Sequence, residues 1–308
     1  MRVDVVVIGG GAAGLSAATV LARARRTVVV VDGGEPRNAP AGHTHGFLSR
    51  DGVEPRQLLA AGRAEMVGYG GHFLSGLVTS IERSDGGFVI HTTDLVLTAR
   101  VVLVATGLRD ELPSIAGVRE QWGIDVLHCP YCHGYEVRDS PIAVIGGENR
   151  PFTLHQAALV RQWSDDVIFF PNGIELTTQE RHALLARDIR IDTEPVARIA
   201  VRAGRVHAVD LIDGRSVPRR TVFVGPTFLP RHELLKDLGC DLGENGWVTV
   251  DPTGLTNVAG VWAAGNVVDS PAQLIGAAAA GSRSAIAVNH YLLAQDIEYA
   301  LTRNQPVG

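Results

Sequence analysis

The fold of this 308-residue chain is restricted above all by its first 32 residues. Val3–Ile8 is a β-branched apolar run interrupted only by Asp4, the pattern of a strand buried on both faces of a parallel sheet. A glycine-rich turn, Gly9–Gly14, follows and leads into an alanine-rich segment with helical spacing. A second strand, Thr27–Val31, then ends in Asp32. Strand, glycine turn, helix, strand and acid in this order predict a dinucleotide-binding βαβ unit.

Three glycines of this turn are each expected to meet a different structural requirement of dinucleotide binding. Gly9 permits the tight turn, Gly11 lets the backbone approach a pyrophosphate, and Gly14 lets the helix pack closely on the strand. The carboxylate of Asp32 can hydrogen-bond an adenosine ribose. The residues that we expect against the dinucleotide are Gly9, Gly11, Ala12, Ala13, Gly14, Asp32 and Gly33.

The segment 33–47 is too rich in glycine, proline and polar residues for a regular element, and it follows a strand at the edge where parallel sheets bind ligands. His43 and His45 in this loop either lie over the cofactor or are merely solvated. Further strands are predicted at 87–92, 94–98, 100–107, 141–145, 166–170, 198–209 (two strands) and 221–226, and helices at 55–67, 231–238 and 272–293.

A second motif, Cys129-Pro130-Tyr131-Cys132, lies in the middle of the chain. Two cysteines separated by two residues can close a small disulfide ring, and a thiol at a helix start loses its proton easily. Pro130 suits the first helical position, where its missing N–H would have been unpaired anyway. His128 and His133 flank the pair, and either could stabilise a thiolate or carry a proton. We interpret the segment as a redox centre.

Other uses of the cysteines are disfavoured. A structural zinc site would need four ligands, and Cys240 is the only other cysteine, so we predict no metal site. A purely structural disulfide is unexpected, because the cysteine content is low and no secretory leader is visible; we expect a cytoplasmic protein. A net charge of -5 gives no electrostatic footprint for nucleic acid. Glycines interrupt the apolar run Val3–Ala22, so we expect no membrane span.

Four motifs together resemble the thioredoxin-reductase-like flavoproteins: the opening fingerprint, Ala105-Thr106-Gly107, the Cys-x-x-Cys and Gly260–Val267 occur in that family's order. The resemblance implies an α/β fold of two Rossmann-like three-layer domains and a homodimer. A discontinuous domain, residues 1–112 and 228–308, would bind FAD, and an inserted NAD(P)-domain-like unit, 113–227, would carry the cysteines. By this resemblance the FAD site also includes Arg37, Asn38, His45, Ala105, Thr106, Gly107, Gly265, Asn266, Ala272 and Gln273.

The inserted unit departs from a thioredoxin reductase at its own nucleotide loop. Glu148 and Pro151 occupy the second and third fingerprint positions, where a carboxylate repels a pyrophosphate and a proline removes a backbone donor. The segment Pro171–Glu175 follows the next strand in place of the family's basic cluster for the NADPH 2′-phosphate. We therefore predict weak or absent NADPH binding.

The form Cys-Pro-Tyr-Cys-His-Gly-Tyr-Glu, with His155-Gln156-Ala157 and Asn266, is similar to the dithiol oxidases of the gliotoxin and holomycin pathways. Those enzymes oxidise a small-molecule dithiol and pass the electrons through FAD to oxygen. We expect a substrate thiolate to attack Cys129, with Cys132 facing the flavin by resemblance and His133 as acid–base group. His128 and His155 are lesser candidates.

Two other functions stay open. One is a disulfide reductase of the thioredoxin-reductase type, which would act on a thioredoxin-like protein with NADPH or another donor such as ferredoxin. The other is a flavin-binding redox sensor that turns nothing over. Steady-state turnover with any dithiol would argue against a sensor.

Overall fold

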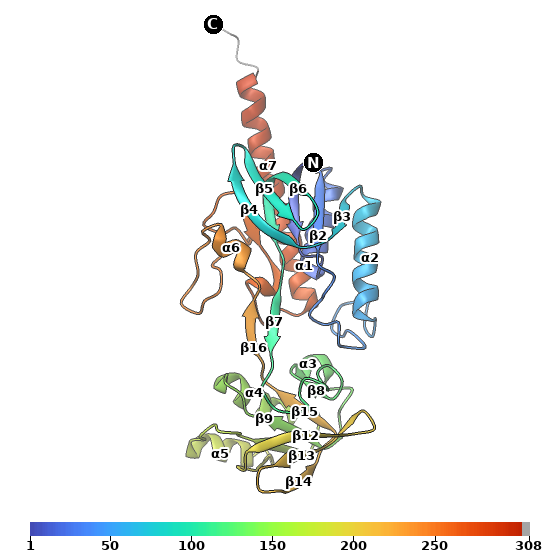
Figure 1. Cartoon of the computed structure of the whole chain (residues 1–308), viewed down its shortest axis with the longest axis vertical. Helices are drawn as coiled ribbons and strands as arrows, with labels where there is room; N and C mark the ends of the chain where they lie inside the picture. The colour runs from blue at the N-terminus through green and yellow to red at the C-terminus, as the bar shows by residue number, and fades with distance from the viewer. Residues whose placement is uncertain (304–308) are drawn as a thin grey trace.

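The computed structural model describes residues 1–303 and contains a mixed sheet and a parallel sheet joined by a pair of linking strands (Figure 1). The first sheet has the order β3-β2-β1-β6-β5-β4, and β17 also pairs with β6. Its strands are β1 (Arg2–Ile8), β2 (Val28–Asp32), β3 (His72–Ser75), β4 (Val78–Ser84), β5 (Gly87–Thr92), β6 (Val96–Val104) and β17 (Val261–Ala263). β1, β2, β3, β6 and β17 pair in parallel, while β5 pairs antiparallel with β4 and β6.

Both faces of this sheet are covered, which explains why β1 is apolar at nearly every position. Val5 and Val7 pack against α1 (Ala12–Arg23), α2 (Pro55–Gly68) and α7 (Leu274–Arg303). Val6 and Ile8 face the opposite side, toward β4, β5 and α6 (Glu233–Asp237). Alternate residues of a strand point to opposite faces, so a covered sheet needs a continuous apolar run.

Two antiparallel strands, β7 (Leu108–Glu111) and β16 (Thr227–Pro230), connect the first sheet to the second (Figure 1). The second sheet has the order β11-β10-β9-β15-β8 and is parallel throughout. Its strands are β8 (Val126–Leu127), β9 (Ile142–Ile145), β10 (Val167–Phe170), β11 (Arg190–Ile191) and β15 (Thr221–Val224).

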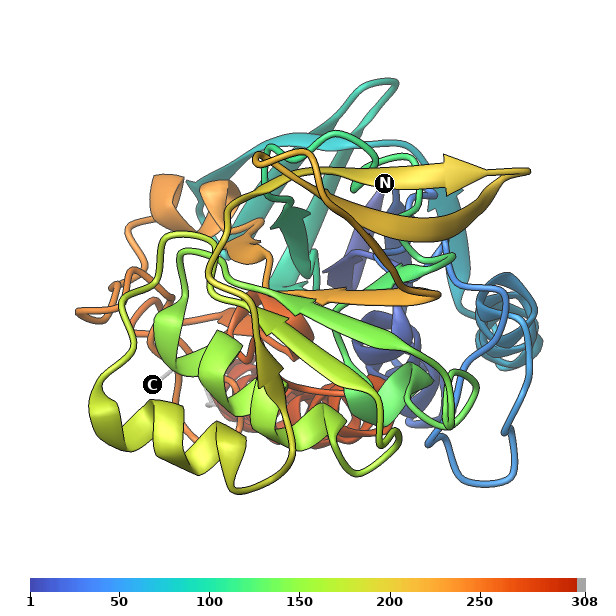
Figure 2. The same ribbon diagram turned by 90° about the horizontal axis from the view of Figure 1, so that it is seen from below.

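Figure 2 shows the layers of this second part. On one face, Ile142 and Val144 pack with α4 (Arg150–Val160) and α5 (Thr178–Leu185). On the other, Ala143 and Ile145 face the antiparallel sheet of β12 (Val196–Arg202), β13 (Arg205–Leu211) and β14 (Ser216–Pro218). The short helix α3 (Pro130–His133) and the 3₁₀ turn η1 (Gly265–Val267) complete the elements.

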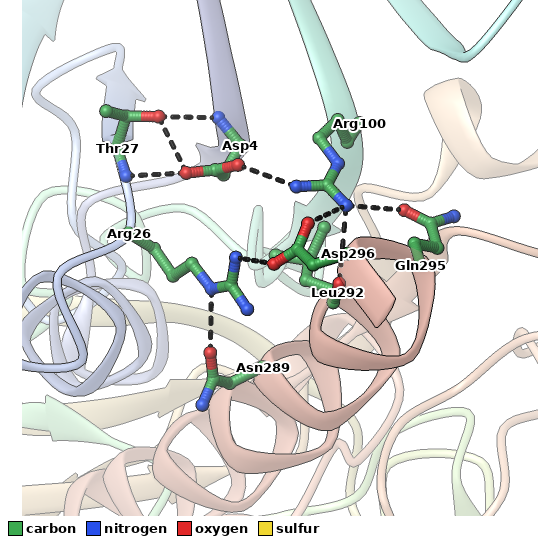
Figure 3. Close-up of polar contacts among 8 residues, drawn as sticks. All are labelled: Asp4, Arg26, Thr27, Arg100, Asn289, Leu292, Gln295 and Asp296. Carbon is green, nitrogen blue, oxygen red and sulfur yellow. Dashed lines mark hydrogen bonds and ion pairs between the residues drawn. The ribbon is translucent and has the colours of Figure 1, made fainter. Parts of the chain in front are cut away.

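A polar network ties the second half of α7 to the first sheet (Figure 3). Asp296 on α7 pairs with Arg26 at 2.6 Å and with Arg100 of β6 at 2.7 Å. Arg26 also donates to Asn289 at 2.8 Å, and Arg100 pairs with Asp4 of β1 at 3.1 Å. The pKa of Asp296 is lowered mainly by the hydrogen bond from Arg26 and further by the contacts with Arg100. The network fixes α7 over the sheet.

The predicted α/β class is confirmed. The predicted runs 94–98 and 100–107 form one strand, β6, and α7 extends past the predicted end at 293 to Arg303. None of the helices within residues 1–303 combines the length and apolar content of a membrane-spanning segment. The domain limits 1–112, 113–227 and 228–308 stay a prediction.

Candidate functional site

One cavity of about 1180 Å³ runs from the glycine turn of the first sheet, past the two cysteines, to α4 of the second. This volume exceeds the roughly 300–1,000 Å³ of an ordinary small-molecule pocket. The predicted site residues that line it are Gly9, Gly11, Ala12, Ala13, Asp32, Gly33, Arg37, Asn38, His45, Ala105, Thr106, Gly107, Cys129, Cys132, His133, Gly265, Asn266, Ala272 and Gln273. Gly14 does not line the cavity, because it packs against the first strand.

The glycine turn forms a cradle at one end of the cavity. Gly9 has a φ of 106°, which a residue with a side chain rarely adopts. A Cβ added at Gly14 would collide with the carbonyl of Gly9, so a glycine is required for the close helix–strand contact. Gly11 caps α1 without a side-chain hydrogen bond and has open space beside it. The first N–H groups of α1 are thus left for an anionic ligand.

Asp32 ends β2 beside this cradle. Its carboxylate accepts hydrogen bonds from the backbone N–H of Gly10 at 2.7 Å and of Gly34 at 3.0 Å. These bonds fix the carboxylate at the mouth of the glycine turn, and each oxygen keeps a free lone pair. The position suits a ligand that donates hydroxyl hydrogen bonds, as a ribose does.

The redox pair lies at the start of α3. Cys129 is the N-cap residue and Pro130 occupies the first turn, as predicted. Cys129 and Cys132 are joined by a disulfide with their Cα atoms 5.3 Å apart. Both residues are half-buried and line the cavity. A small disulfide ring facing a large cavity is accessible to a thiol.

His133 follows the disulfide directly and also lines the cavity. Its Nδ1 atom is buried and has no hydrogen-bond partner among the described residues. Burial lowers the pKa of His133, Glu136 opposes that shift, and the proximity of His45 adds to it. His133 is therefore neutral near pH 7, and a neutral imidazole with a free nitrogen can accept a proton.

His128 precedes the disulfide in the chain, and its ring is buried among aromatic side chains and Arg37. Its ring stacks on Trp122 with centroids 5.6 Å apart, and it meets the edge of Phe228 at 6.0 Å. Its Nε2 lies 3.3 Å from Nη2 of Arg37. Burial first, and then the charge of Arg37, lower the pKa of His128 to about 4. A proton-carrying role at neutral pH, which the sequence left open, does not fit this low pKa.

The loop after β2 touches the disulfide segment through His45. Nδ1 of His45 lies 3.2 Å from Asp51 in the same loop, and Nε2 lies 3.4 Å from Glu136 beyond α3. His43 is exposed, and its Nδ1 lies 3.1 Å from the carbonyl of Gly52. Of the two loop histidines, His45 is the one that bridges to the disulfide segment.

Asn266 lies in η1, after β17. Its Nδ2 donates to the carbonyls of Asp269 at 2.9 Å, Ser270 at 3.2 Å and Ala272 at 2.9 Å. These bonds shape the turn that leads into α7, and they leave the Oδ1 of Asn266 free to accept a hydrogen bond. The side chain thus positions the cavity wall at Ala272.

The loop after β9, where the sequence predicted a defective nucleotide site, is closed by its own side chains. Asn149 caps α4 by accepting from the N–H of Phe152 at 3.2 Å. Arg150 pairs with Glu180 of α5 at 2.5 Å, and this hydrogen bond lowers the pKa of Glu180 to about 2. Glu148 is exposed and accepts a weak hydrogen bond from Thr227 at 3.4 Å. The N–H of Phe152 and the guanidinium of Arg150 therefore already have partners within the protein, which leaves fewer donors for a phosphate group.

The cavity also has aromatic residues that the sequence reasoning missed, beside His155 and Gln156, which it had singled out. Trp122, Phe152 and Phe228 add an aromatic wall near the disulfide, and Gln156 donates to the carbonyl of His128 at 2.6 Å. Exposed His155 lines the cavity on α4. No spacing in the sequence marks the aromatic residues, because they come from separate elements. Among residues 1–303, no three histidine, cysteine or acidic side chains gather as a metal-binding set.

Known proteins share this architecture. A family model described as pyridine nucleotide-disulphide oxidoreductase matches residues 3–281. Thioredoxin reductase sirT of Leptosphaeria maculans is 31% identical over 315 residues, which cover 96% of this chain and 95% of the relative. The crystal structure of HlmI superposes with a TM-score of 0.94 at 51% identity, covering 98% of this chain and 96% of that chain. An oxidoreductase from Agrobacterium tumefaciens gives a TM-score of 0.89 at 36% identity, with 95% and 99% covered.

Members of this family typically bind FAD, and the cradle at the glycine turn has the free N–H groups, open space and carboxylate that a dinucleotide needs. The disulfide of Cys129 and Cys132 lies in the same cavity. With the match over residues 3–281 and the identity to sirT, the chain belongs to the pyridine nucleotide-disulphide oxidoreductase family and is thioredoxin-reductase-like within it.

Proposed function

We propose that this protein is an FAD-dependent dithiol oxidase that converts a small-molecule dithiol into its disulfide without using NADPH. The observation that carries the proposal is the shape of the cavity, which joins the dinucleotide cradle, the Cys129–Cys132 disulfide and the aromatic wall in one space. The loop after β9 supports it, since Glu148 and the capped start of α4 disfavour a second dinucleotide. The motif similarity to the gliotoxin and holomycin oxidases points the same way.

The proposed reaction begins with thiol–disulfide exchange at the Cys129–Cys132 bond. A substrate thiolate attacks the sulfur of Cys129, the Cys129–Cys132 bond breaks, and Cys132 leaves as a thiolate. The second substrate thiol, after losing its proton to His133, attacks the substrate sulfur bound to Cys129, so that the product disulfide leaves and Cys129 is reduced. FAD bound in the cradle would take the two electrons from the cysteines and deliver them to oxygen, which becomes hydrogen peroxide.

The test is an anaerobic mixing experiment with the purified flavoprotein. Dithiothreitol is added to one cuvette and NADPH to another, and the visible flavin absorbance is followed. We expect the dithiol alone to bleach the flavin, and admitted air to restore it with one peroxide formed per dithiol oxidised. Cys129→Ser is the matched control and should abolish bleaching by the dithiol. Rapid bleaching by micromolar NADPH would refute the proposal.

A second candidate is a disulfide reductase, because sirT, a relative with 31% identity, is named a thioredoxin reductase. The same experiment separates the two. A reductase would be bleached by NADPH and would then reduce a protein disulfide such as that of thioredoxin. If neither dithiothreitol nor NADPH produces turnover, the flavin-binding redox sensor would be the remaining function.

A further inference from the structure

Arg37 lies at the centre of a polar cluster between the two sheets. It belongs to the loop after β2, whereas Asp110 belongs to the linking strand β7 and His128 precedes Cys129. Nε and Nη2 of Arg37 donate to the two carboxylate oxygens of Asp110 at 2.8 and 2.7 Å. The same Nη2 lies 3.3 Å from Nε2 of His128. A single side chain thus joins the loop of the first sheet to the segment that carries the disulfide.

The chemistry of this contact fixes the state of His128. A guanidinium has five N–H donors and no acceptor, and it keeps its charge at any pH at which a protein is folded. The nitrogen that faces it must therefore be an acceptor, so Nε2 of His128 carries a lone pair and no proton. The ring proton then lies on Nδ1, and the imidazole is neutral.

The surroundings of His128 hold it in this state. Trp122 and Phe228 enclose the ring, and Arg37 also lies over Phe228 with its Cζ 5.0 Å from the ring centre. The charged and titratable groups that act on His128 are Arg37, Asp110 and His133. Burial and Arg37 together outweigh Asp110, and with a pKa of about 4 roughly one His128 ring in a thousand is protonated at pH 7.

We propose that Arg37 is a positioning residue that fixes the tautomer of the buried, neutral His128 beside Cys129, with the proton on Nδ1 and a lone pair on Nε2, so that His133 and not His128 receives the protons released at the disulfide. A cationic His128 next to Cys129 would stabilise the Cys129 thiolate and lower its nucleophilicity, which would slow the step in which Cys129 and Cys132 re-form their disulfide. The statement about proton transfer rests on the proposed oxidase function. The state of His128 does not, because it is a property of the oxidised protein without substrate.

The experiment is histidine NMR on the oxidised, FAD-loaded protein with ¹⁵N-labelled imidazole rings. The chain has 11 histidines, and His128→Gln assigns the signal of interest by its disappearance. In the wild type we expect the His128 ring to show a protonated Nδ1 and an unprotonated Nε2, unchanged between pH 6 and pH 8. In Arg37→Gln the pKa of His128 should rise by about one pH unit or more, because the repelling charge is gone while Asp110 stays.

Three further variants make the test sharp. Arg37→Lys keeps the positive charge, so the pKa of His128 should stay low even though the paired hydrogen bonds to Asp110 are lost. Asp110→Asn removes the opposing negative charge, and the pKa of His128 should not rise. Arg63→Gln is the matched control, because Arg63 also lies over an aromatic ring, Phe73, but is not among the groups that act on His128.

Two results would overturn the proposal. One is a wild-type His128 that carries its proton on Nε2. The other is a His128 signal that titrates identically in the wild type and in a folded Arg37→Gln protein. If Arg37→Gln fails to fold, the wild type and Arg37→Lys still test the proposal, because both should keep the proton of His128 on Nδ1 and its pKa low. A wild-type protein that shows the expected His128 signals but does not turn over a dithiol would instead count against the oxidase function, and the assigned state of His128 would stand.

Discussion

At the scale of single residues, the two cysteines differ in their place on α3. Cys129 is the N-cap residue, whereas Cys132 lies within the short helix. By resemblance, we expect Cys132 to face the flavin and Cys129 to meet the substrate. The two sulfurs should therefore have different partners once the disulfide is reduced.

This difference predicts opposite spectra for the two serine variants. In Cys129→Ser the remaining Cys132 thiolate should give the bound flavin a long-wavelength charge-transfer band, and in Cys132→Ser that band should be absent. Both variants should lose dithiol oxidation by at least about 100-fold, because each breaks the disulfide relay. Cys240→Ser is the control, since Cys240 is buried away from the cavity and burial raises the pKa of its thiol. The reverse pattern of bands would exchange the roles of the two cysteines.

His133 makes the oxidation depend on pH in a direction that its surroundings set. Burial lowers the pKa of His133 below its usual 6.5, so the proton-accepting form persists at mildly acidic pH. We expect kcat to be constant near pH 7 and to fall only as the pH drops through the lowered pKa. His133→Gln should reduce kcat by about 100-fold or more and remove this acidic limb.

Glu136 influences the pKa of His133 in the opposite direction from burial. Its negative charge raises the pKa of His133, so Glu136→Gln should move the acidic limb of kcat to lower pH. A limb that stays in place, or that moves to higher pH, would show that another group controls it. Asp139→Asn, which changes an exposed carboxylate just beyond Glu136, serves as the matched control.

At the scale of elements, α7 is held to the first sheet by charges as well as by apolar contacts. Asp296 lies between Arg26 and Arg100, and its side chain keeps an exposed fraction of 40%. We expect Asp296→Asn to lower the free energy of unfolding by about 1 kcal/mol, a modest value because solvent screens the pairs. Urea unfolding followed by circular dichroism measures it, and Asp213→Asn, which breaks an ion pair in an exposed turn, should have a smaller effect.

The pH dependence of that difference follows from linkage. The pKa of Asp296 is lower in the folded protein than in the unfolded chain, so folding favours the charged form. The stabilisation is complete above about pH 4 and is lost as the pH falls through the folded-state pKa. The wild type and Asp296→Asn should therefore converge in stability below pH 4. A constant difference down to pH 3 would contradict the ion-pair explanation.

The elements that the sequence predicted well are those with strong local patterns. The largely apolar strands β1, β2, β9 and β10 and the glycine turn of α1 follow from residues close together in the chain. The strands β7 and β16 were not predicted, because Leu108–Glu111 pairs with Thr227–Pro230 and their partners lie over a hundred residues apart. The cluster of Arg37, Asp110 and His128 was missed for the same reason, since only the folded chain brings it together.

At the scale of the whole molecule, one end of α7 extends beyond the first sheet (Figure 1). Ile286, Leu293, Ile297 and Leu301 are spaced by seven and four residues and lie on one face of this helix. Their exposed fractions are 50%, 50%, 51% and 64%. A contiguous apolar stripe on the surface usually marks a protein contact. Together with the family resemblance, the stripe leads us to expect a homodimer that buries it.

Light scattering tests this expectation. The wild type at micromolar concentration should have twice the mass of the 32.8 kDa chain. Leu293→Glu combined with Ile297→Glu places charges in the stripe and should give a monomer, because an unpaired charge cannot be buried without a large cost. Ile212→Glu is the matched control, since Ile212 is 66% exposed in the turn between β13 and β14. A monomeric wild type would contradict the expected homodimer. A double variant that stays dimeric, with α7 intact by circular dichroism, would place the subunit contact elsewhere.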